Sequence, residues 1–158
     1  MRLSTKGRYA VMAMVDLAKF GDGKPVALSE IALRQEISLS YLEQLFAKMR
    51  RAGLVNSVRG PGGGYVLCRP AAETRLCDII LAVDEPIRAT RCSPGSPVGC
   101  TGERVRCITH DLWEELGNLI HLFFSSISLA DVVERRILGK SGVIHQDRLQ
   151  DRSAAAAE

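Results

Sequence analysis

Residues 38–65 read SLSYLEQLFAKMRRAGLVNSVRGPGGGY, a stretch that joins a helical pattern to a glycine-rich turn. Helical spacing places four apolar side chains on one face of its first half, and we expect them to pack inward. These residues are Leu42, Leu45, Phe46 and Met49. Serines are typical of helix starts, and Gly53 stands where a helix commonly ends. The pattern predicts a helix to about residue 52. Ser38 and Ser40 are both predicted as N-caps, and Ser40 with Glu43 also fits a capping box.

Two short strands are predicted directly after this helix, over residues 54–58 and 65–68. The loop between them, residues 59–64, contains four glycines and a proline. This composition is typical of the tip of a β-hairpin.

Two further helices are predicted ahead of the opening stretch. Apolar spacing indicates one from residue 4 or 5 to 20, and a short one over 29–36, capped by Ser29, with Ile31 and Leu33 inward. Three helices followed by a hairpin are the order of a winged helix-turn-helix, whose second motif helix enters the major groove of DNA. We therefore expect a mainly α fold with a small β-hairpin wing.

Polar and basic side chains lie on the outer face of the helix that ends near residue 52. Gln can pair with adenine, Glu can accept from cytosine, Ser can bond to base edges, and Lys and Arg suit phosphate. Arg59, at the base of the hairpin, is placed to enter a narrow minor groove. An ordinary polar helix face, with the serines and Glu43 as caps, is the alternative interpretation. The residues that we expect to contact DNA are Ser38, Ser40, Tyr41, Glu43, Gln44, Lys48, Arg51 and Arg59.

The charge is divided unevenly along the 158 residues, whose net charge is +3. Residues 1–69 carry eleven Lys and Arg against five Asp and Glu, a net +6, whereas 70–158 carry ten against thirteen, a net −3. This asymmetry indicates different partners for the two halves. The sequence shows no signal peptide or membrane-spanning run, and its five cysteines are an odd number, so we expect a cytoplasmic protein without a disulfide framework and without a membrane partner.

Three cysteines and a histidine are grouped in a loop predicted over residues 86–110. Cys92, Cys100, Cys107 and His110 are separated by seven, six and two residues. Three thiolates and an imidazole suit a structural zinc or an iron–sulfur cluster, and the spacing leaves both open. The loop lacks the aromatic residues that an RNA-binding zinc finger would need.

A second use of cysteine is structural. Cys68 and Cys77 lie in apolar stretches and are expected to be core thiols, and the same role for the loop cysteines is the alternative to metal binding. Cys107 with His110 is the sole local pair that could form a reactive thiol site. Without a phosphate-binding glycine loop or paired carboxylates, we do not expect an enzyme.

A heptad-like seam marks the helix predicted from residue 111 to about 127. We interpret it as a dimerisation helix, which suits a two-fold protein that reads a palindromic DNA site. Packing within the chain is the alternative. Leu112 and Leu119 widen the seam. The seam residues are Trp113, Leu116, Ile120, Phe123 and Ile127.

These patterns divide the chain into four expected segments. A winged helix-turn-helix covers residues 1–85 and includes a helix over 75–83. A ligand-binding loop follows over 86–110. The dimerisation helix and a short helix capped by Ser128 cover 111–138, and a disordered tail is expected over 139–158.

Five motifs together resemble the IscR family of iron–sulfur cluster regulators. They are RLxxKGRYA at 2–10, ISLSYLEQLF at 37–46, SVRGPGGGY at 57–65, ATRC at 89–92 and CITHxLW at 107–113. The resemblance covers about residues 1–138. It departs from the family pattern in the intervals between the cysteines, which are longer here, although all four ligand positions are present.

The resemblance implies a homodimeric winged-helix transcription factor that holds a [2Fe-2S] cluster supplied by the cluster-assembly machinery. The implied ligands are Cys92, Cys100, Cys107 and His110. It further implies that cluster occupancy selects promoters, with repression, and in some cases activation, of cluster-assembly genes. By the same resemblance, Ser40, Tyr41 and Gln44 contact bases, and Arg59 enters the minor groove. We add Glu43 as the residue that discriminates between operators.

Overall fold

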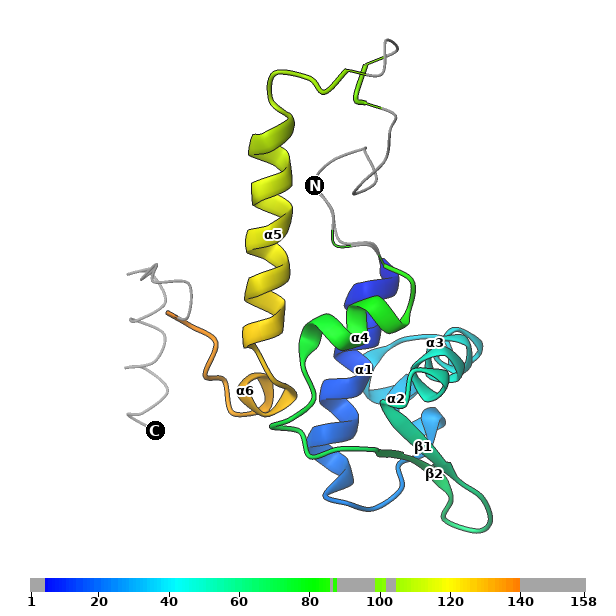
Figure 1. The fold of residues 1–158 in the computed structure, drawn as a ribbon. Helices are drawn as coiled ribbons and strands as arrows, with labels where there is room; N and C mark the ends of the chain where they lie inside the picture. Colours follow the sequence, from blue (N-terminus) through cyan, green and yellow to red (C-terminus); the bar gives the residue numbers. More distant parts are fainter. Residues whose placement is uncertain (1–4, 86, 88–98, 102–104, 140–158) are drawn as a thin grey trace.

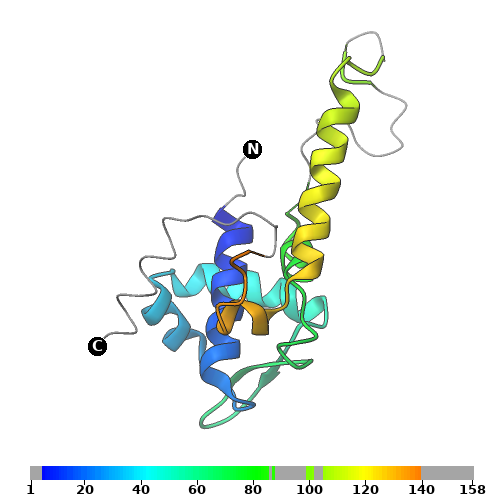
Figure 2. The same cartoon turned by 90° about the vertical axis from the view of Figure 1, so that its left-hand side faces the viewer.

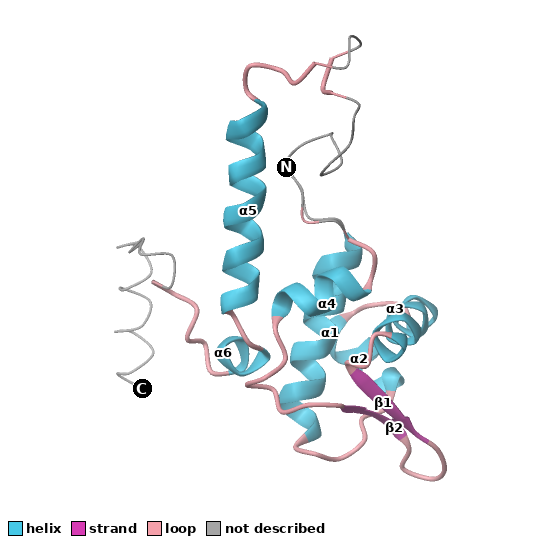
Figure 3. Ribbon diagram, in the orientation of Figure 1, coloured by secondary structure: helices cyan, strands magenta, loops and turns pink. Residues whose placement is uncertain are grey.

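The structure, a computed structural model, describes residues 5–85, 87, 99–101 and 105–139. Its helices form a body from which one long helix, α5, projects (Figures 1 and 2). A two-stranded hairpin lies at the far side of that body (Figure 3). The elements are α1 (Thr5–Gly21), α2 (Leu28–Gln35), α3 (Leu39–Arg51), β1 (Val55–Val58), β2 (Gly64–Leu67), α4 (Leu76–Ala82), α5 (His110–Ser126) and α6 (Leu129–Val133).

Helix α1 is the centre of the core, and it packs against α2, α3, α4, α6 and β2. Its apolar residues lie on several faces, so it is covered on several sides. Its fully or almost fully buried residues include Ala10, Ala13, Met14 and Leu17.

One polar contact fixes α2 against α1. The carboxylate of Asp16 is completely buried, and Arg34 donates to it from Nε at 3.1 Å and from Nη2 at 2.7 Å. Gln35 donates a further hydrogen bond of 2.7 Å to the same carboxylate. A buried charge is tolerated when it is paired and hydrogen-bonded in this way.

The start of α2 differs from the sequence prediction. The helix begins at Leu28 with Ala27 in the cap position, so Ser29 is not its cap. Ile31 is buried as expected, whereas Leu33 is 83% exposed. The prediction for Leu33 is wrong. Ile31 and Leu33 are two positions apart in one helix, so their side chains point about 200° apart and cannot both face the core.

Helix α3 confirms the predicted inward face, because Leu42, Leu45, Phe46 and Met49 are all buried. Its start is two residues earlier than the capping box requires. Ser38 holds the cap position, and its carbonyl accepts a hydrogen bond of 3.1 Å from the Leu42 N–H. Ser40 therefore already lies in the first turn, and the predicted capping box with Glu43 is wrong.

The hairpin pairs Val55 with Leu67 at one end and Val58 with Gly64 at the other. It is held to the segment before α2, where Val26 and Tyr65 exchange backbone hydrogen bonds of 3.0 and 2.9 Å. At Gly64 an added Cβ would lie 2.3 Å from the Val26 carbonyl oxygen. Glycine at this position allows the segment that contains Val26 to approach the hairpin closely.

The C-terminal part returns to the core after α5. The Leu76 N–H donates to the Ile127 carbonyl, and the Leu129 N–H donates to the Thr74 carbonyl, both at 3.0 Å. Ile127 and Leu129 are completely buried in the same core as α1. Ile127, which we assigned to the dimer seam, is thus occupied inside its own chain.

A capping box does occur at α6, where Ser128 was predicted as the cap. The Asp131 N–H donates to the Ser128 hydroxyl at 3.2 Å, and the Ser128 N–H donates to the Asp131 carboxylate at 3.0 Å. The helix ends at Val133, earlier than residue 138. Residues 140–158 of the predicted tail and most of the 86–110 loop, including Cys92, lie outside the described residues. Within the described segments, no helix has the length and apolar character needed to cross a membrane.

Candidate DNA interface and metal centre

Helix α3 presents the predicted DNA-contacting side chains on the face opposite its buried residues. The exposed members of this set are Ser38, Ser40, Glu43, Gln44, Arg51 and Arg59, the last in the turn after β1. The structure thus leaves these groups accessible to a groove.

Tyr41 differs from its neighbours because it is half-buried. Its ring meets that of Tyr9 edge to face, with centroids 6.0 Å apart and planes at 85°. The Tyr9 ring of α1 therefore supports one side of Tyr41 and limits the directions in which it can point.

Lys48 is bound to another part of the same chain. Its Nζ donates a 2.6 Å hydrogen bond to Asp84 Oδ2, which follows α4 and has a left-handed backbone with φ of 57°. This contact raises the pKa of Lys48, and it lowers the pKa of the Asp84 carboxyl, to which the charges of Lys6 and Arg51 add. Sequence reasoning missed the pair, because 36 residues separate its members.

Two of the described metal-ligand candidates lie in direct contact at the start of α5. Cys100 Sγ is 3.0 Å from His110 Nδ1. Cys107 lies in the turn before α5, where its carbonyl accepts a 2.9 Å hydrogen bond from the His110 N–H. Its Sγ is 3.5 Å from Thr109 Oγ1. The Cys100 thiol therefore contacts the imidazole at the start of α5, while Cys107 lies in the turn that leads to it, with its own thiol beside Thr109.

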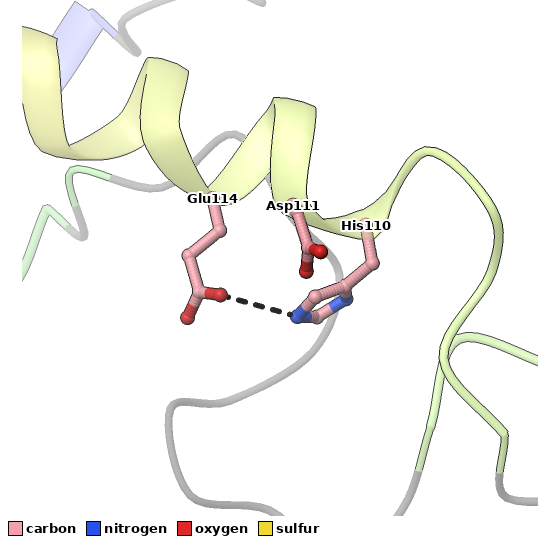
Figure 4. Close-up of side chains that lie close together, drawn as sticks. All are labelled: His110, Asp111 and Glu114. Carbon is pink, nitrogen blue, oxygen red and sulfur yellow. Dashed lines mark ion pairs between the residues drawn. The ribbon is translucent and has the colours of Figure 1, made fainter.

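Carboxylates surround the other side of the His110 ring. His110 Nε2 is 3.5 Å from Glu114 Oε2, one helical turn further along, as Figure 4 shows. Ligand atoms of His110, Asp111 and Glu114 all lie within 4.8 Å of one another. Glu114 was not singled out from the sequence, although its i,i+4 spacing from a candidate ligand is a readable signal.

Along α5 the apolar residues divide into two sets. Leu116, Ile120 and Phe123 of the predicted seam are half-buried, and the Trp113 indole N–H donates to Thr109 Oγ1 at 3.2 Å. More exposed leucines lie beside the seam. They are Leu112, Leu119 and Leu122, of which Leu122 is 63% exposed. Sequence reasoning included the first two as a wider seam but missed Leu122.

Comparison with known proteins agrees with the fold. The model of the Rrf2 family, described as iron-dependent transcriptional regulators, matches residues 3–135. The HTH-type transcriptional regulator IscR of Photorhabdus laumondii is 48% identical over 159 residues, which cover 100% of this chain and 95% of the relative.

Solved structures of transcriptional regulators are also similar to this chain. IscR of T. potens superposes with a TM-score of 0.69 at 36% identity, covering 92% of this chain and 93% of that one. CymR, the global cysteine regulator of B. subtilis, gives 0.72 at 32% identity, covering 85% and 98%.

These comparisons confirm three sequence predictions: the resemblance to IscR proteins, the mainly α winged-helix fold, and a role as a transcriptional regulator and not as an enzyme. The family match spans the helices and the hairpin described above, as well as the turn that carries Cys107 and His110. The chain therefore belongs to the Rrf2 family of iron-dependent transcriptional regulators.

Proposed function

We propose that this regulator binds palindromic promoter DNA as a homodimer and senses iron–sulfur cluster status through a [2Fe-2S] cluster. The cluster comes from the cluster-assembly machinery, and the cluster-loaded protein represses the genes of that machinery, with activation at other promoters. The observation that carries the proposal is the 3.0 Å approach of Cys100 Sγ to His110 Nδ1 at the start of α5.

The donor set fits such a cluster chemically. Thiolates with a histidine nitrogen are ligands of [2Fe-2S] centres. Cys100 contacts His110, and Cys107 lies in the turn that leads to His110. We assign Cys92 as the fourth ligand on the family motif alone. When bound, the cluster would supply a redox-active and labile group whose presence reports iron–sulfur supply. Among the described residues, Cys100 contributes an exposed thiol, Cys107 a half-buried thiol and His110 a buried imidazole.

The DNA-binding part of the proposal places α3 in the major groove. Ser38, Ser40, Tyr41 and Gln44 contact bases or adjacent phosphates, Arg51 contacts phosphate, and Lys48 does so after leaving Asp84. Arg59 enters the minor groove beside the wing. Glu43 rejects operators that do not offer a cytosine amino group.

The dimer part of the proposal uses α5. Trp113, Leu116, Ile120 and Phe123 form the seam, and the exposed Leu122 extends it. An exposed apolar strip of this kind is typical of a protein interface. We keep the division into a DNA-binding unit over 1–85, a cluster loop over 86–110, a dimerisation segment over 111–138 and a separate tail.

An anaerobic absorption spectrum with iron and sulfide quantitation tests the cluster. We expect a coloured protein with equal amounts of iron and sulfide, and loss of the colour in Cys92→Ala and Cys100→Ala. Cys68→Ala is the matched control, because Cys68 is a half-buried thiol next to β2 and should leave the spectrum unchanged. A colourless wild-type protein with stoichiometric zinc would contradict the proposal.

A further inference from the structure

The two ring nitrogens of His110 face chemically different partners. Nδ1 lies 3.0 Å from Cys100 Sγ. Nε2 lies 3.5 Å from Glu114 Oε2. The side chain of His110 is only 7% exposed, so the ring has little freedom to exchange these partners.

This arrangement determines where the imidazole proton lies. An ionised carboxylate only accepts hydrogen bonds, so the nitrogen beside Glu114 is favoured as the protonated one. In the neutral ring the other nitrogen then carries the lone pair that can bind a metal. Here that nitrogen is Nδ1, which faces the thiol of Cys100.

We propose that Glu114 is a positioning residue, which holds His110 with Nε2 protonated and directs Nδ1 to the cluster iron. A carboxylate partner commonly orients a metal-binding histidine in this way. The inference rests on the proposed cluster function. It adds which nitrogen binds and which side chain selects it.

The helix makes Glu114 suitable for this role. It is one turn after His110 on α5, and its carboxylate points back to the ring from the same face (Figure 4). The adjacent Glu115 has a different contact, because its Oε2 accepts a 3.5 Å hydrogen bond from Asn118 Nδ2. Glu115 is therefore a matched control with the same charge on the same helix.

Pulsed EPR of the reduced cluster tests the ligating atom. The wild-type protein is prepared with histidine that is labelled with 15N at either Nδ1 or Nε2. We expect the strong hyperfine coupling of a directly bound nitrogen from the Nδ1 label, and a weak coupling from the Nε2 label. Strong coupling from the Nε2 label would overturn the inference while leaving the cluster function intact.

Cluster loss to an iron chelator, followed by visible absorption, tests Glu114 itself. Glu114→Ala should lose the cluster about tenfold faster, because partners of a metal-binding histidine commonly contribute 10- to 100-fold to affinity. Glu114→Gln should stay within about twofold of wild type, since its amide oxygen still accepts from Nε2–H. A wild-type rate in Glu114→Ala, or an equal effect in Glu115→Ala, would overturn the role of Glu114.

A separate measurement needs no cluster. Long-range proton–nitrogen NMR of the metal-free, reduced protein reports which nitrogen of His110 carries the proton. We expect the Nε2–H form in the wild type and a mixture in Glu114→Ala, and a dominant neutral Nδ1–H form in the wild type would overturn the inference. A wild-type protein that shows Nε2–H but takes up no cluster would overturn the proposed function while leaving the role of Glu114 in selecting the protonated nitrogen intact.

Discussion

Lys48 shows how one side chain of α3, the helix that we propose binds DNA, is engaged by its own chain. Its ammonium group is bonded to Asp84 in the segment that leads toward the ligand-bearing loop. A phosphate that binds Lys48 must therefore displace a carboxylate. The lowered pKa of Asp84 keeps that carboxylate charged at neutral pH, so the competition weakens only in acid, as the pH falls through the pKa of Asp84 in the folded protein.

Replacing Asp84 by Asn should strengthen DNA binding. We expect the Kd for duplex DNA at low salt to fall by up to about fivefold, because an exposed ion pair of this kind binds weakly and is screened by salt. Fluorescence anisotropy over a salt series measures the change. Asp22→Asn is the control, since it removes the same charge from an exposed turn after α1. Equal gains in both variants would mean that net charge, and not release of Lys48, is responsible.

The proposed role of Glu43 concerns the preference for one DNA sequence over another. Its carboxylate is exposed on α3 beside Gln44. We expect Glu43→Ala to reduce the ratio of the Kd values for two operators of different sequence by about tenfold. One base contact is worth about 1–3 kcal/mol of discrimination. Competition binding with both operators measures it. Gln44→Ala should instead lower the affinity for both. An unchanged ratio of the two Kd values in Glu43→Ala would exclude the proposed role of this residue.

At the scale of elements, helical spacing predicts α1, α3 and α5 because each has a long run of apolar residues at helical intervals. The predicted start at Ser29 is wrong because Ala27 holds the cap position of α2, and of the two caps predicted for α3 the structure uses Ser38 instead of Ser40. Contacts across the sequence, such as Lys48 with Asp84, leave no periodic signal. For the candidate site, the sequence indicates the ligand types and the exposed face of α3, but not the distances between them.

The contact between α1 and α2 should be sensitive to a single substitution. We expect Asp16→Ala to lower the free energy of unfolding by about 3 kcal/mol, because it leaves Arg34 and Gln35 without their shared buried partner. Chemical denaturation measures the loss. Glu30→Ala removes the 3.5 Å surface contact of the same Arg34 and should cost about 0.5 kcal/mol. Similar losses in both variants would argue against Asp16 as the main link between these helices.

At the scale of the whole molecule, α5 stands away from the body and carries exposed leucines (Figures 1 and 2). A dimer that covers them would account for apolar side chains in contact with water. Ile127 does not take part, because it is completely buried beside α1. The proposed seam is therefore shorter at its C-terminal end than the sequence indicated, and broader at Leu122.

A charged residue in this strip should separate the two copies. We expect Leu122→Glu to weaken dimerisation by about 100-fold or more, because an unpaired charge would be desolvated in the interface. Analytical ultracentrifugation measures the dissociation constant. Leu33→Glu is the matched control, since Leu33 is equally apolar and 83% exposed but lies on α2. A dimer that survives Leu122→Glu unchanged would exclude this surface.

The anchoring of α5 also constrains how the chain can change its length. The helix has 17 residues, and its C-terminal end is fixed by the backbone bonds of Ile127 and Leu129. Each residue inserted within it would turn His110 by about 100° and move it by about 1.5 Å relative to that anchor. We therefore expect length changes within α5 to displace His110, whereas the segment before His110, which contains the three cysteines, can change in length without moving it. The length of α5 thus sets the position of His110 relative to the core, and the loop before it can vary in length.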